Sequence, residues 1–268
     1  MTVFSRNILA DRERRLELME LLRESVERGF AGFSIHYQPQ ADTLSGRLCG
    51  AEALARWHCG KYGDVSPGEF IPLMEQSGLI VPFGQWILSH GMAQCLEWRR
   101  SRPDFQISVN LSYIQLSQGD FISFLRTALE ENSLDPSRLI MELTETYLAK
   151  AEEDTLRLIA QMKELGVKIA MDDFGVGYSS LFSLKSIPVD VVKIDRRFVK
   201  GITSEPFNAT FIRSITDLCH DVGRKVCLEG VETKEEYEAV RELGMEYIQG
   251  YYFGRPMSAR QFEDRLKE

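Results

Sequence analysis

Short apolar segments alternate with longer amphipathic segments along most of the chain. The short segments are five to eight residues long and almost continuously apolar, and eight of them lie at 33–38, 50–57, 105–110, 139–143, 167–172, 189–194, 225–229 and 245–249. They are too short for typical helices, and most lack the strict alternation of a strand with one wet face. The pattern therefore predicts strands that are covered on both faces.

The longer segments carry apolar residues at helical spacing. They lie at 67–77, 83–101, 117–132, 147–165, 206–222, 233–243 and 258–267. Strand and helix alternate for more than 200 residues, and no linker rich in Pro, Gly or Ser interrupts them. This order favours one (β/α)8 TIM-type barrel over two doubly wound domains.

The first two strand segments depart from this pattern. Only about a dozen residues, including the turn-like sequence DTLSG at 42–46, separate them. That connection is too short for a crossover helix and favours a hairpin. We therefore expect a modified barrel with one antiparallel strand near the amino terminus.

The amino-terminal region predicts an amphipathic helix over 11–28. Leu18, Leu22 and Val26 recur every four residues, and Gly29 is a suitable C-terminal stop. We expect two parts: an N-terminal helix or connector at 1–30, and the barrel at 31–268.

Composition and charge narrow the classes of function. The 268 residues are 44% hydrophobic and 27% charged, which is typical of a globular protein with a sizeable core. No apolar run approaches the roughly 20 residues of a membrane span, and the amino-terminal stretch at 11–30 is too charged for a signal peptide. The five cysteines are scattered, which indicates reduced thiols rather than a zinc site. A cytoplasmic location is expected, and the net charge of −8 argues against binding to a nucleic acid polymer.

Polar side chains mark the ends of the predicted strands. From the third strand onward they are Asn110, Glu142, Asp172, Lys193, Glu229 and Gln249, and the second strand carries Glu52. In a barrel, the carboxyl ends of the parallel strands meet at one face, where the loops build the active site. These residues are therefore expected to become neighbours.

Several carboxylates that lie this close together need positive charge to offset their mutual repulsion. Two carboxylates about 4 Å apart repel by roughly 4 kcal/mol at an effective dielectric constant near 20. The oxygen ligands of Glu52, Glu142, Asp172 and Asp173 suit Mg²⁺ or Mn²⁺ better than zinc, and adjacent aspartates suit a pair of ions. Gly175 and Gly177 would let the chain turn sharply after these aspartates.

Simpler interpretations exist for each residue alone. A single acid at a strand end is more often a helix cap or an ion-pair partner than a metal ligand. Seven polar or charged side chains at comparable positions on successive strands weigh against that interpretation. Lys193 is open to two other interpretations, a surface ion pair or a Schiff-base lysine, and Arg56 could pair with an acid.

Several longer motifs together resemble one known family. They are YQPQ (37–40), EALARW (52–57), SPGEFIPLMEQSGLI (66–80), VNLS (109–112), ELTET (142–146), DDFGVGYSSL (172–181), VKIDRRFV (192–199), EGVET (229–233) and QGYYFGRP (249–256). In this order they resemble the EAL-domain family of cyclic di-GMP phosphodiesterases, over about residues 33–258.

The resemblance implies hydrolysis of cyclic di-GMP to the linear dinucleotide pGpG with two Mg²⁺ or Mn²⁺ ions, and inhibition by Ca²⁺. It implies an in-line attack on phosphorus by a metal-activated water. The implied ligands of the first ion are Glu52, Asn110, Glu142 and Asp172, and those of the second are Asp172, Asp173 and Glu229. Besides Glu52, the implied catalytic residues are Lys193, which steadies the nucleophile and the developing charge, and Glu229, which helps to accept the proton.

The resemblance also implies roles around this centre. Arg56 would hold a substrate phosphate, Gln38 and Gln249 would contact substrate or ordered water, and Glu145 and Glu232 would support the loops and ligands. It further implies a homodimer and, if the chain is an excised module, an upstream sensor or diguanylate-cyclase-like domain.

The chain departs from the family pattern at three positions. Val176 stands where the family usually has threonine, which removes a hydroxyl from the loop after Asp173, and Leu228 and Arg197 stand where alanine and serine are common. Two other functions stay open: a receptor of the same fold that binds cyclic di-GMP or a protein partner without hydrolysis, and an aldolase-like barrel that uses Lys193.

Overall fold

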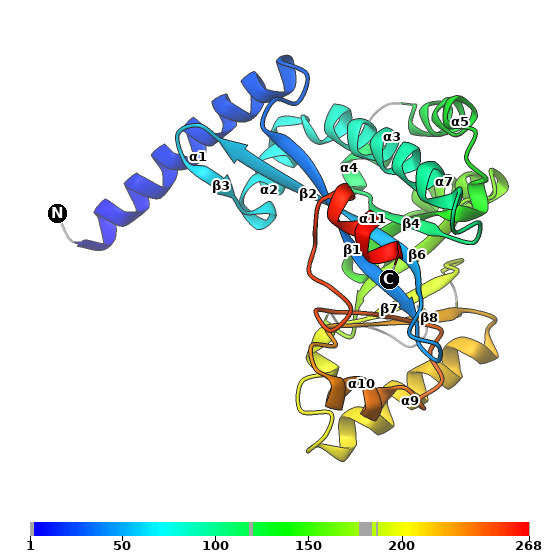
Figure 1. Ribbon diagram of the computed structural model, residues 1–268. Coiled ribbons are helices and arrows are strands. Elements are labelled where there is room, and N and C mark those ends of the chain that lie inside the picture. The colour runs from blue at the N-terminus through cyan, green and yellow to red at the C-terminus, as the bar shows by residue number, and fades with distance from the viewer. Residues whose placement is uncertain (1–2, 118–119, 177–183, 186, 268) are drawn as a thin grey trace.

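Eight strands close into a barrel in the computed structural model, which describes residues 3–117, 120–176, 184–185 and 187–267, with side chains from residue 11 onward (Figure 1). The strands are β1 (Phe33–Asp42), β2 (Leu48–Cys59), β4 (Gln106–Asn110), β5 (Leu139–Thr144), β6 (Lys168–Phe174), β7 (Val191–Ile194), β8 (Lys225–Glu229) and β9 (Tyr247–Gln249). The predicted α/β barrel is confirmed.

β1 is the antiparallel strand of the ring. It pairs antiparallel with β2, where Gln38 lies opposite Glu52, and with β9, where Gln40 lies opposite Gln249. The pairs from β2 through β4 to β9 are all parallel. The expected hairpin is therefore confirmed, and β1 places its amino-terminal half at the mouth where the other strands end.

One strand was not predicted. β3 (Gly63–Val65) pairs antiparallel with the end of β2, from Trp57 to Cys59, and extends the sheet to nine strands. Its three residues contain no apolar run. It forms because the two strands meet through the tight turn after Cys59, a contact that hydrophobic patterning does not reveal.

Helices cover the outside of the barrel. Those near their predicted positions are α2 (Pro67–Ser77), α3 (Ile80–Arg99), α5 (Phe121–Asn132), α9 (Pro206–Asp221), α10 (Lys234–Val240) and α11 (Ala259–Lys267). Caps fix several of their starts. Ser66 accepts a hydrogen bond from the Gly68 amide at the start of α2, and Thr233 and Glu236 form a capping box on α10.

The single helix predicted over 147–165 is wrong. The structure has two helices, α6 (Glu145–Leu148) and α7 (Glu153–Glu164), separated by a short connection. A further short helix, α4 (Tyr113–Ser117), precedes α5, and Asp120 caps α5 by accepting from the Ser123 amide. Residues of high helix propensity lie between Leu148 and Glu153, but they do not form a helix there. α6 instead begins directly after β5.

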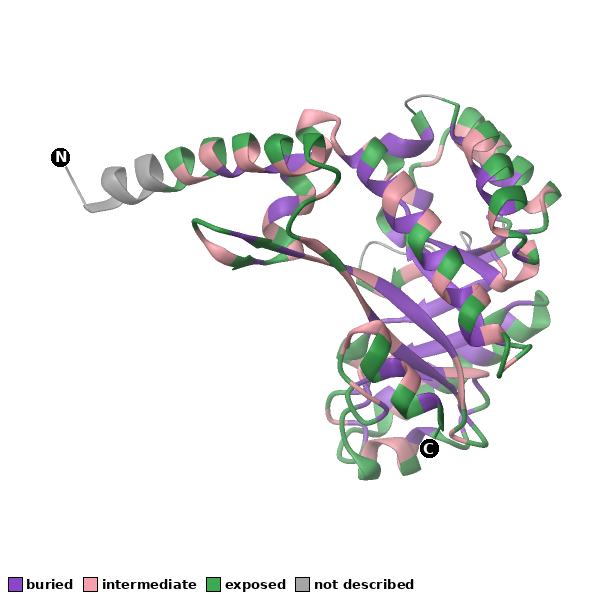
Figure 2. Ribbon diagram, turned by 45° about the horizontal axis from the view of Figure 1, so that its top comes forward, coloured by how far each residue is buried: buried purple, intermediate pink, exposed green. Residues whose placement is uncertain are grey.

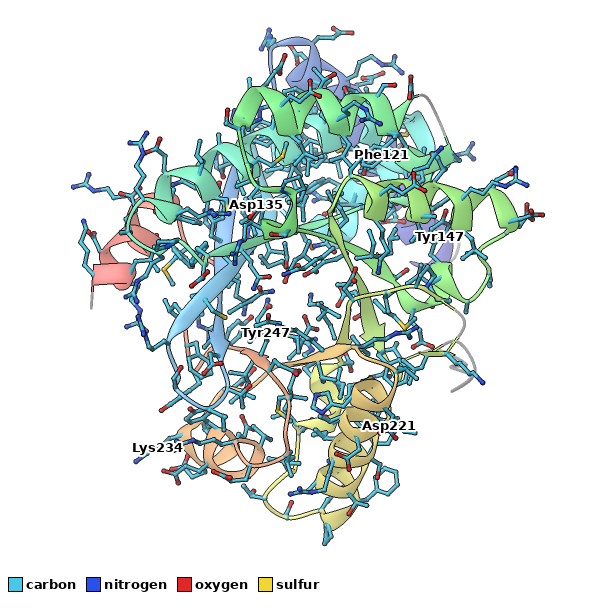
Figure 3. The ribbon with its side chains drawn as sticks, turned by 90° about the vertical axis from the view of Figure 1, so that its right-hand side faces the viewer. Phe121, Asp135, Tyr147, Asp221, Lys234 and Tyr247 are labelled. Carbon is cyan, nitrogen blue, oxygen red and sulfur yellow. The ribbon has the colours of Figure 1, made fainter. Side chains whose placement is uncertain are left out.

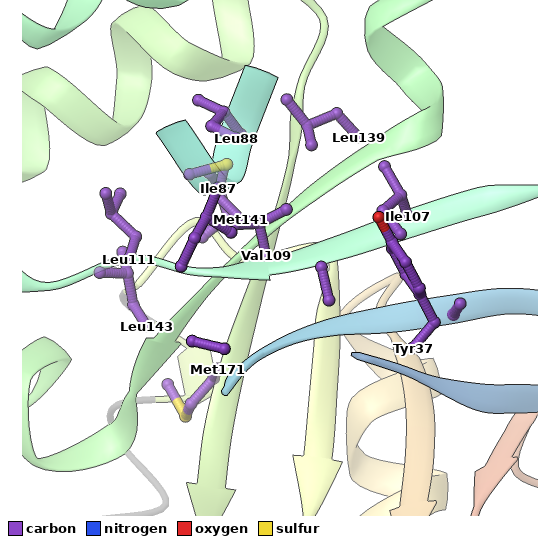
Figure 4. Packing of buried hydrophobic residues seen from close by; sticks show 14 of the residues in the cluster. Tyr37, Ile87, Leu88, Ile107, Val109, Leu111, Leu139, Met141, Leu143 and Met171 are labelled. Atoms are coloured by element: carbon purple, nitrogen blue, oxygen red, sulfur yellow. The ribbon is translucent and has the colours of Figure 1, made fainter. Parts of the chain in front are cut away.

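The outward-facing side chains of the strands form the main core. Ile107 and Val109 of β4 lie against α3, where a Cβ on Gly91 would be 3.8 Å from Ile107 Cγ1 and 3.5 Å from Val109 Cγ2. Figure 4 shows these residues with Leu139, Met141 and Leu143 of β5. Figure 2 shows the strands as the buried centre and the outer helix surfaces as exposed.

A second, smaller core lies inside the barrel. It consists of Ile140, Ala170, Val191 and Cys227, with Tyr247 packed against it. Figure 3 shows the side chains that fill the space within the ring of strands, with Tyr247 at its edge. Because side chains alternate along a strand, the residues two positions further on also point inward.

The N-terminal helix α1 (Val3–Glu27) is longer than predicted and extends away from the barrel (Figures 1 and 2). Leu18 and Leu22 are fully buried, and Arg14 forms an ion pair of 2.6 Å with Glu69 on α2. Within the described ranges, no helix combines the length and the apolar character needed to cross a bilayer.

Candidate active site

A charged layer lies directly above the inner apolar core. Four strands carry an apolar residue and then, two positions later, a charged one: Ile140 and Glu142, Ala170 and Asp172, Val191 and Lys193, Cys227 and Glu229. The period of two places all four charged side chains on the inside of the ring, one layer nearer the carboxyl ends of the strands. The barrel thus gathers residues that are up to 87 positions apart.

Lys193 lies at the centre of this layer. Its Nζ atom is 2.6 Å from Glu142 Oε2, 2.8 Å from Glu229 Oε1, 3.2 Å from Asp172 Oδ1 and 3.5 Å from Glu52 Oε2. The side chains of Lys193 and Glu142 are almost fully buried. Four carboxylates therefore share one ammonium group, and the layer carries an excess of negative charge.

Burial and this excess charge shift the pKa values. Burial and the charge of Glu52 raise the pKa of Glu142 well above its usual value, and burial together with Asp172 raises the pKa of Glu229 to about 7. Burial opposes the charged form of Lys193, but the surrounding carboxylates prevail and raise its pKa. Lys193 is therefore held in its charged form, and some of the acids retain protons near neutral pH unless another cation is present.

Amide side chains hold Glu52 in place. Asn110 Nδ2 donates to Glu52 Oε1 at 2.7 Å, and Gln249 Nε2 donates to Glu52 Oε2 at 2.7 Å. With Lys193 they lower the pKa of Glu52 against the opposing effect of its burial. Gln249 also donates to Gln38 at 3.2 Å and accepts from Gln40 at 3.0 Å. This network links β1, β2, β4 and β9.

The donor set fits a divalent cation. Oxygens of Asp172, Asp173 and Glu229 lie within 4.8 Å of one another, which is compatible with an acidic metal-binding group. Glu142 Oε1 is buried and has no hydrogen-bond partner among the described residues. An unpaired buried carboxylate oxygen is costly, and carboxylate and amide oxygens are the ligands that Mg²⁺ and Mn²⁺ prefer.

The chain turns sharply just after Asp172. Asp173 has φ of +58° and Gly175 has φ of +93°, and the Gly175 amide donates to Glu145 Oε2 at 2.9 Å. A Cβ on Gly175 would lie 2.5 Å from Cε2 of Phe198, so only glycine fits there. The expected turn is confirmed at Gly175, whereas Gly177 lies outside the described residues.

Two hollows flank the charged layer. The larger, of about 690 Å³, is lined by Arg56, Asn110, Asp173 and apolar residues of α2 and α3, including Ile71 and Phe83. The smaller, of about 240 Å³, is lined by Glu52, Asp172, Glu229, Gln249 and Tyr251, among others. Both hollows reach the charged layer or its neighbours, the larger through Asn110 and Asp173 and the smaller through Glu52, Asp172 and Glu229.

The EAL domain family model matches residues 19–256. The chain belongs to the EAL-domain family. It is 37% identical over 259 residues to the bifunctional diguanylate cyclase/cyclic di-GMP phosphodiesterase MucR of Pseudomonas aeruginosa, covering 96% of this chain and 38% of that protein. It is 36% identical over 229 residues to the cyclic di-GMP phosphodiesterase PdeR of Escherichia coli, covering 85% of this chain and 34% of that protein.

A solved structure of this EAL-domain family has the same fold. The PaMucR phosphodiesterase in complex with c-di-GMP superposes with a TM-score of 0.84 and is 38% identical, covering 92% of this chain and 99% of that one. The chain spans little more than a third of the length of the two curated relatives. The family resemblance found in the sequence motifs is thus confirmed.

The structure brings most of the predicted site residues together. The predicted residues that form or contact the charged layer are Glu52, Asn110, Glu142, Asp172, Asp173, Lys193, Glu229, Gln38 and Gln249. Arg56 instead lines the larger hollow, and its Nη1 donates to the carbonyl of Ala55 at 2.7 Å. Glu232 lies at the rim of the smaller hollow.

Sequence reasoning missed three polar residues near the site. Gln40 donates to Gln249, and Arg196 and Tyr251 line the smaller hollow. Gln40 belongs to the reversed strand β1, so the rule that functional residues follow strand ends does not find it. Arg196 follows β7 by two residues, which was a signal available in the sequence.

Proposed function

We propose that the chain hydrolyses one phosphodiester bond of cyclic di-GMP and releases pGpG. The observation that carries the proposal is the layer of four carboxylates around Lys193 at the mouth of an EAL-family barrel. Two named relatives, MucR and PdeR, are described as cyclic di-GMP phosphodiesterases. The full set of expected oxygen ligands in this chain supports the same activity.

We assign the metal-binding role to the oxygen ligands of the layer. Glu52, Asn110, Glu142 and Asp172 would hold one Mg²⁺ or Mn²⁺ ion, and Asp172, Asp173 and Glu229 would hold a second. Divalent cations, when bound, lower the pKa of water and neutralise charge on a phosphoryl oxygen. Ca²⁺ is larger and accepts a looser geometry, so we expect it to bind without supporting turnover.

The chain's own residues orient this chemistry. Lys193 keeps its charge because four carboxylates surround it, so it fixes their positions and opposes negative charge that develops at phosphorus. Burial raises the pKa of Glu229 to about 7 in the metal-free protein. We assign Glu229 as a ligand of the second ion and as a group that helps to accept the proton. Glu52, held by Asn110 and Gln249, completes the catalytic set.

The two hollows favour an extended substrate. The larger one has walls of Ile71, Pro72 and Phe83, which suit the flat face of a purine, and Arg56 at its side suits a phosphate. Gln38 and Gln249 line the smaller hollow, where they can contact substrate or ordered water. We assign Glu145 and Glu232 to support of the loops, because Glu145 accepts from Gly175 and Glu232 lies at the rim.

An aldolase-like use of Lys193 does not fit the structure. A Schiff-base lysine needs a free amine. The Nζ atom of Lys193 is enclosed by carboxylates, its pKa is raised, and its side chain is almost fully buried. A non-hydrolysing receptor is the remaining alternative, and it differs from the enzyme only in whether bound cyclic di-GMP is cut.

Incubation with cyclic di-GMP and Mn²⁺, followed by chromatography of the products, distinguishes the enzyme from the receptor. We expect pGpG with Mn²⁺, and intact cyclic di-GMP with EDTA or Ca²⁺. Glu142→Gln should abolish turnover, whereas Glu164→Gln, on the exposed surface of α7, should leave it unchanged. Bound but uncut cyclic di-GMP in Mn²⁺ would support the receptor instead.

We further propose how this chain works within an assembly. α1 buries Leu18 and Leu22 and is tied to α2 through Arg14 and Glu69, so a movement of α1 would reach the wall of the larger hollow. This supports the assignment of residues 1–30 as a connector to an upstream sensor or diguanylate-cyclase-like domain.

We also propose that two copies of the chain form a homodimer through the region that follows Asp173. Sedimentation velocity tests this proposal by measuring whether the protein is a monomer or a dimer.

A further inference from the structure

The smaller hollow at the mouth of the barrel is strongly acidic. Its described lining includes the carboxylates Glu52, Asp172, Glu229 and Glu232, and the one cation among its described lining residues is Arg196. A dianionic substrate that enters this hollow would be repelled by these acids, and metal ions bound at the charged layer would offset the repulsion only near that layer. Arg196 is therefore the side chain to consider for any phosphate that lies away from that layer.

The backbone of Arg196 is held firmly. It starts the 3₁₀ turn η2 (Arg196–Phe198), two residues after β7, and Asp195 caps this turn by accepting from the Arg197 amide. On its other side the residue packs against Gly230, where an added Cβ would lie 2.1 Å from Arg196 Cβ and 2.9 Å from its Cα. Gly230 also has φ of +82°, so the two segments of the chain meet at a position that requires glycine.

The guanidinium of Arg196 is exposed and makes no hydrogen bond or ion pair to the rest of the described chain. The neighbouring Arg197 is engaged, because its Nε donates to Asp195 at 2.8 Å, and Lys193 is enclosed by carboxylates. Arg56, assigned above to a substrate phosphate, lines the larger hollow and not this one. Arg196 thus combines a fixed backbone with a free, planar donor group at the rim of the hollow.

We propose that Arg196 binds the second phosphate of the cyclic dinucleotide, the one that is not cut. The inference rests on the proposed function. Cyclic di-GMP carries two phosphodiester groups on opposite sides of its ring, each with one negative charge. One of them must lie at the charged layer for hydrolysis, and the other then needs a cation at a distance from it. A guanidinium offers paired donors that match phosphate oxygens.

Arg196 is a substrate-positioning residue on this account, so its loss should weaken binding more than chemistry. Steady-state kinetics with cyclic di-GMP and Mn²⁺ should show that Arg196→Ala raises KM about tenfold while kcat stays within about twofold, which corresponds to the loss of one charge-assisted contact. Arg196→Lys should recover part of this loss. Arg197→Ala is the matched control, because the neighbouring Arg197 pairs with Asp195 instead.

A substrate with one phosphodiester sharpens the comparison. Bis(p-nitrophenyl) phosphate has no second phosphate, so the effect of Arg196→Ala on its kcat/KM should be several-fold smaller than the effect on cyclic di-GMP. Equal losses on both substrates would mean that Arg196 maintains the charged layer, and would overturn the proposal. Unchanged KM for cyclic di-GMP in Arg196→Ala would also overturn it and identify a solvated surface arginine.

Calorimetric titration with cyclic di-GMP in Ca²⁺ tests the contact without hydrolysis. Arg196→Ala should raise Kd about tenfold relative to the wild type and Arg197→Ala. A wild type that binds cyclic di-GMP but never cuts it would contradict the proposed phosphodiesterase activity, while the difference in Kd would still support Arg196 as a phosphate contact. Equal Kd values for Arg196→Ala and the wild type would overturn the inference whichever way the activity falls.

Discussion

Lys193 Nζ lies 2.6 Å from Glu142 Oε2, and the two side chains have exposed fractions of only 2% and 1%. A buried pair of this kind is not in itself strong evidence for stability, because both charges lose their hydration. Here the pair is also unbalanced, since three further carboxylates lie within 3.5 Å of the same ammonium. The layer therefore fits a centre that is completed by additional cations, and it makes several variants informative.

Lys193→Met should destabilise the metal-free protein and abolish turnover. It removes the ammonium that all four carboxylates share, so buried charge is left uncompensated. We expect the free energy of unfolding in EDTA to fall by about 3–5 kcal/mol, measured by urea denaturation. Lys163→Met is the control. Lys163 pairs with Asp190 at 2.7 Å with both side chains about a third exposed, so its loss should cost at most about 1 kcal/mol. Equal effects of the two variants would contradict the account.

Stabilisation by Mg²⁺ should depend on pH. In the metal-free protein the folded state holds a proton on Glu229, whose pKa is raised from 4.5 to about 7, whereas the unfolded chain releases it at lower pH. The stability from this group is fully present below about pH 4.5 and is lost as the pH rises through about 7. Because Mg²⁺ competes with the proton, its binding strengthens as the proton leaves.

The increase in Tm produced by Mg²⁺ should thus be larger near pH 8 than near pH 5.5, as measured by thermal denaturation against matched EDTA samples. In Glu229→Gln this difference should shrink, because the substituted amide does not titrate. An increase in Tm that is the same at both pH values in the wild type would count against the assignment of Glu229 to the metal-binding layer.

Gly175→Ala should lower turnover by disturbing the turn that carries Asp173. Its φ of +93° is unfavourable for alanine, and the new Cβ would lie 2.5 Å from Phe198 Cε2. We expect a loss of more than about 2 kcal/mol in unfolding free energy and a fall in kcat. Gly223→Ala is matched to it, since Gly223 has φ of +74° but no atom within 4 Å. It should cost about 1 kcal/mol without loss of activity. Equal losses would show that the contact with Phe198 has no effect.

Val176→Thr should raise kcat more than it changes KM. Val176 is 46% exposed, so a hydroxyl there costs no buried apolar contact and is free to bond within the loop after Asp173. The measurement is steady-state kinetics with cyclic di-GMP and Mn²⁺. Unchanged kcat would show that other contacts, such as the hydrogen bond from the Gly175 amide to Glu145, already hold this turn.

Much of the barrel could be predicted because its strands are covered on both sides. A strand such as β7, with all four residues buried, appears in the sequence as a short apolar run that ends near a polar residue. β3 contains no such run and forms only through its pairing with β2. The break between α6 and α7 also escaped prediction, because good helix formers such as Ala149 and Lys150 lie within it.

The site was predictable as a set of residues but not as an arrangement. Strand ends indicated Glu142, Asp172 and Glu229, because parallel strands bring their carboxyl ends together. The central place of Lys193 depends on how the ring closes and on which side chains reach its axis. Gln40 lies on the one reversed strand, where the order of residues relative to the mouth is inverted, so the same rule could not find it.

Binding of Mn²⁺ tests the central claim most directly. Electron paramagnetic resonance of free Mn²⁺, titrated with the protein in the presence of pGpG, counts the bound ions. We predict two ions per chain in the wild type and fewer in Glu142→Gln, with no change in the surface variant Glu164→Gln. A wild-type protein that leaves all the Mn²⁺ free would contradict the assignment of the acidic layer as a metal centre.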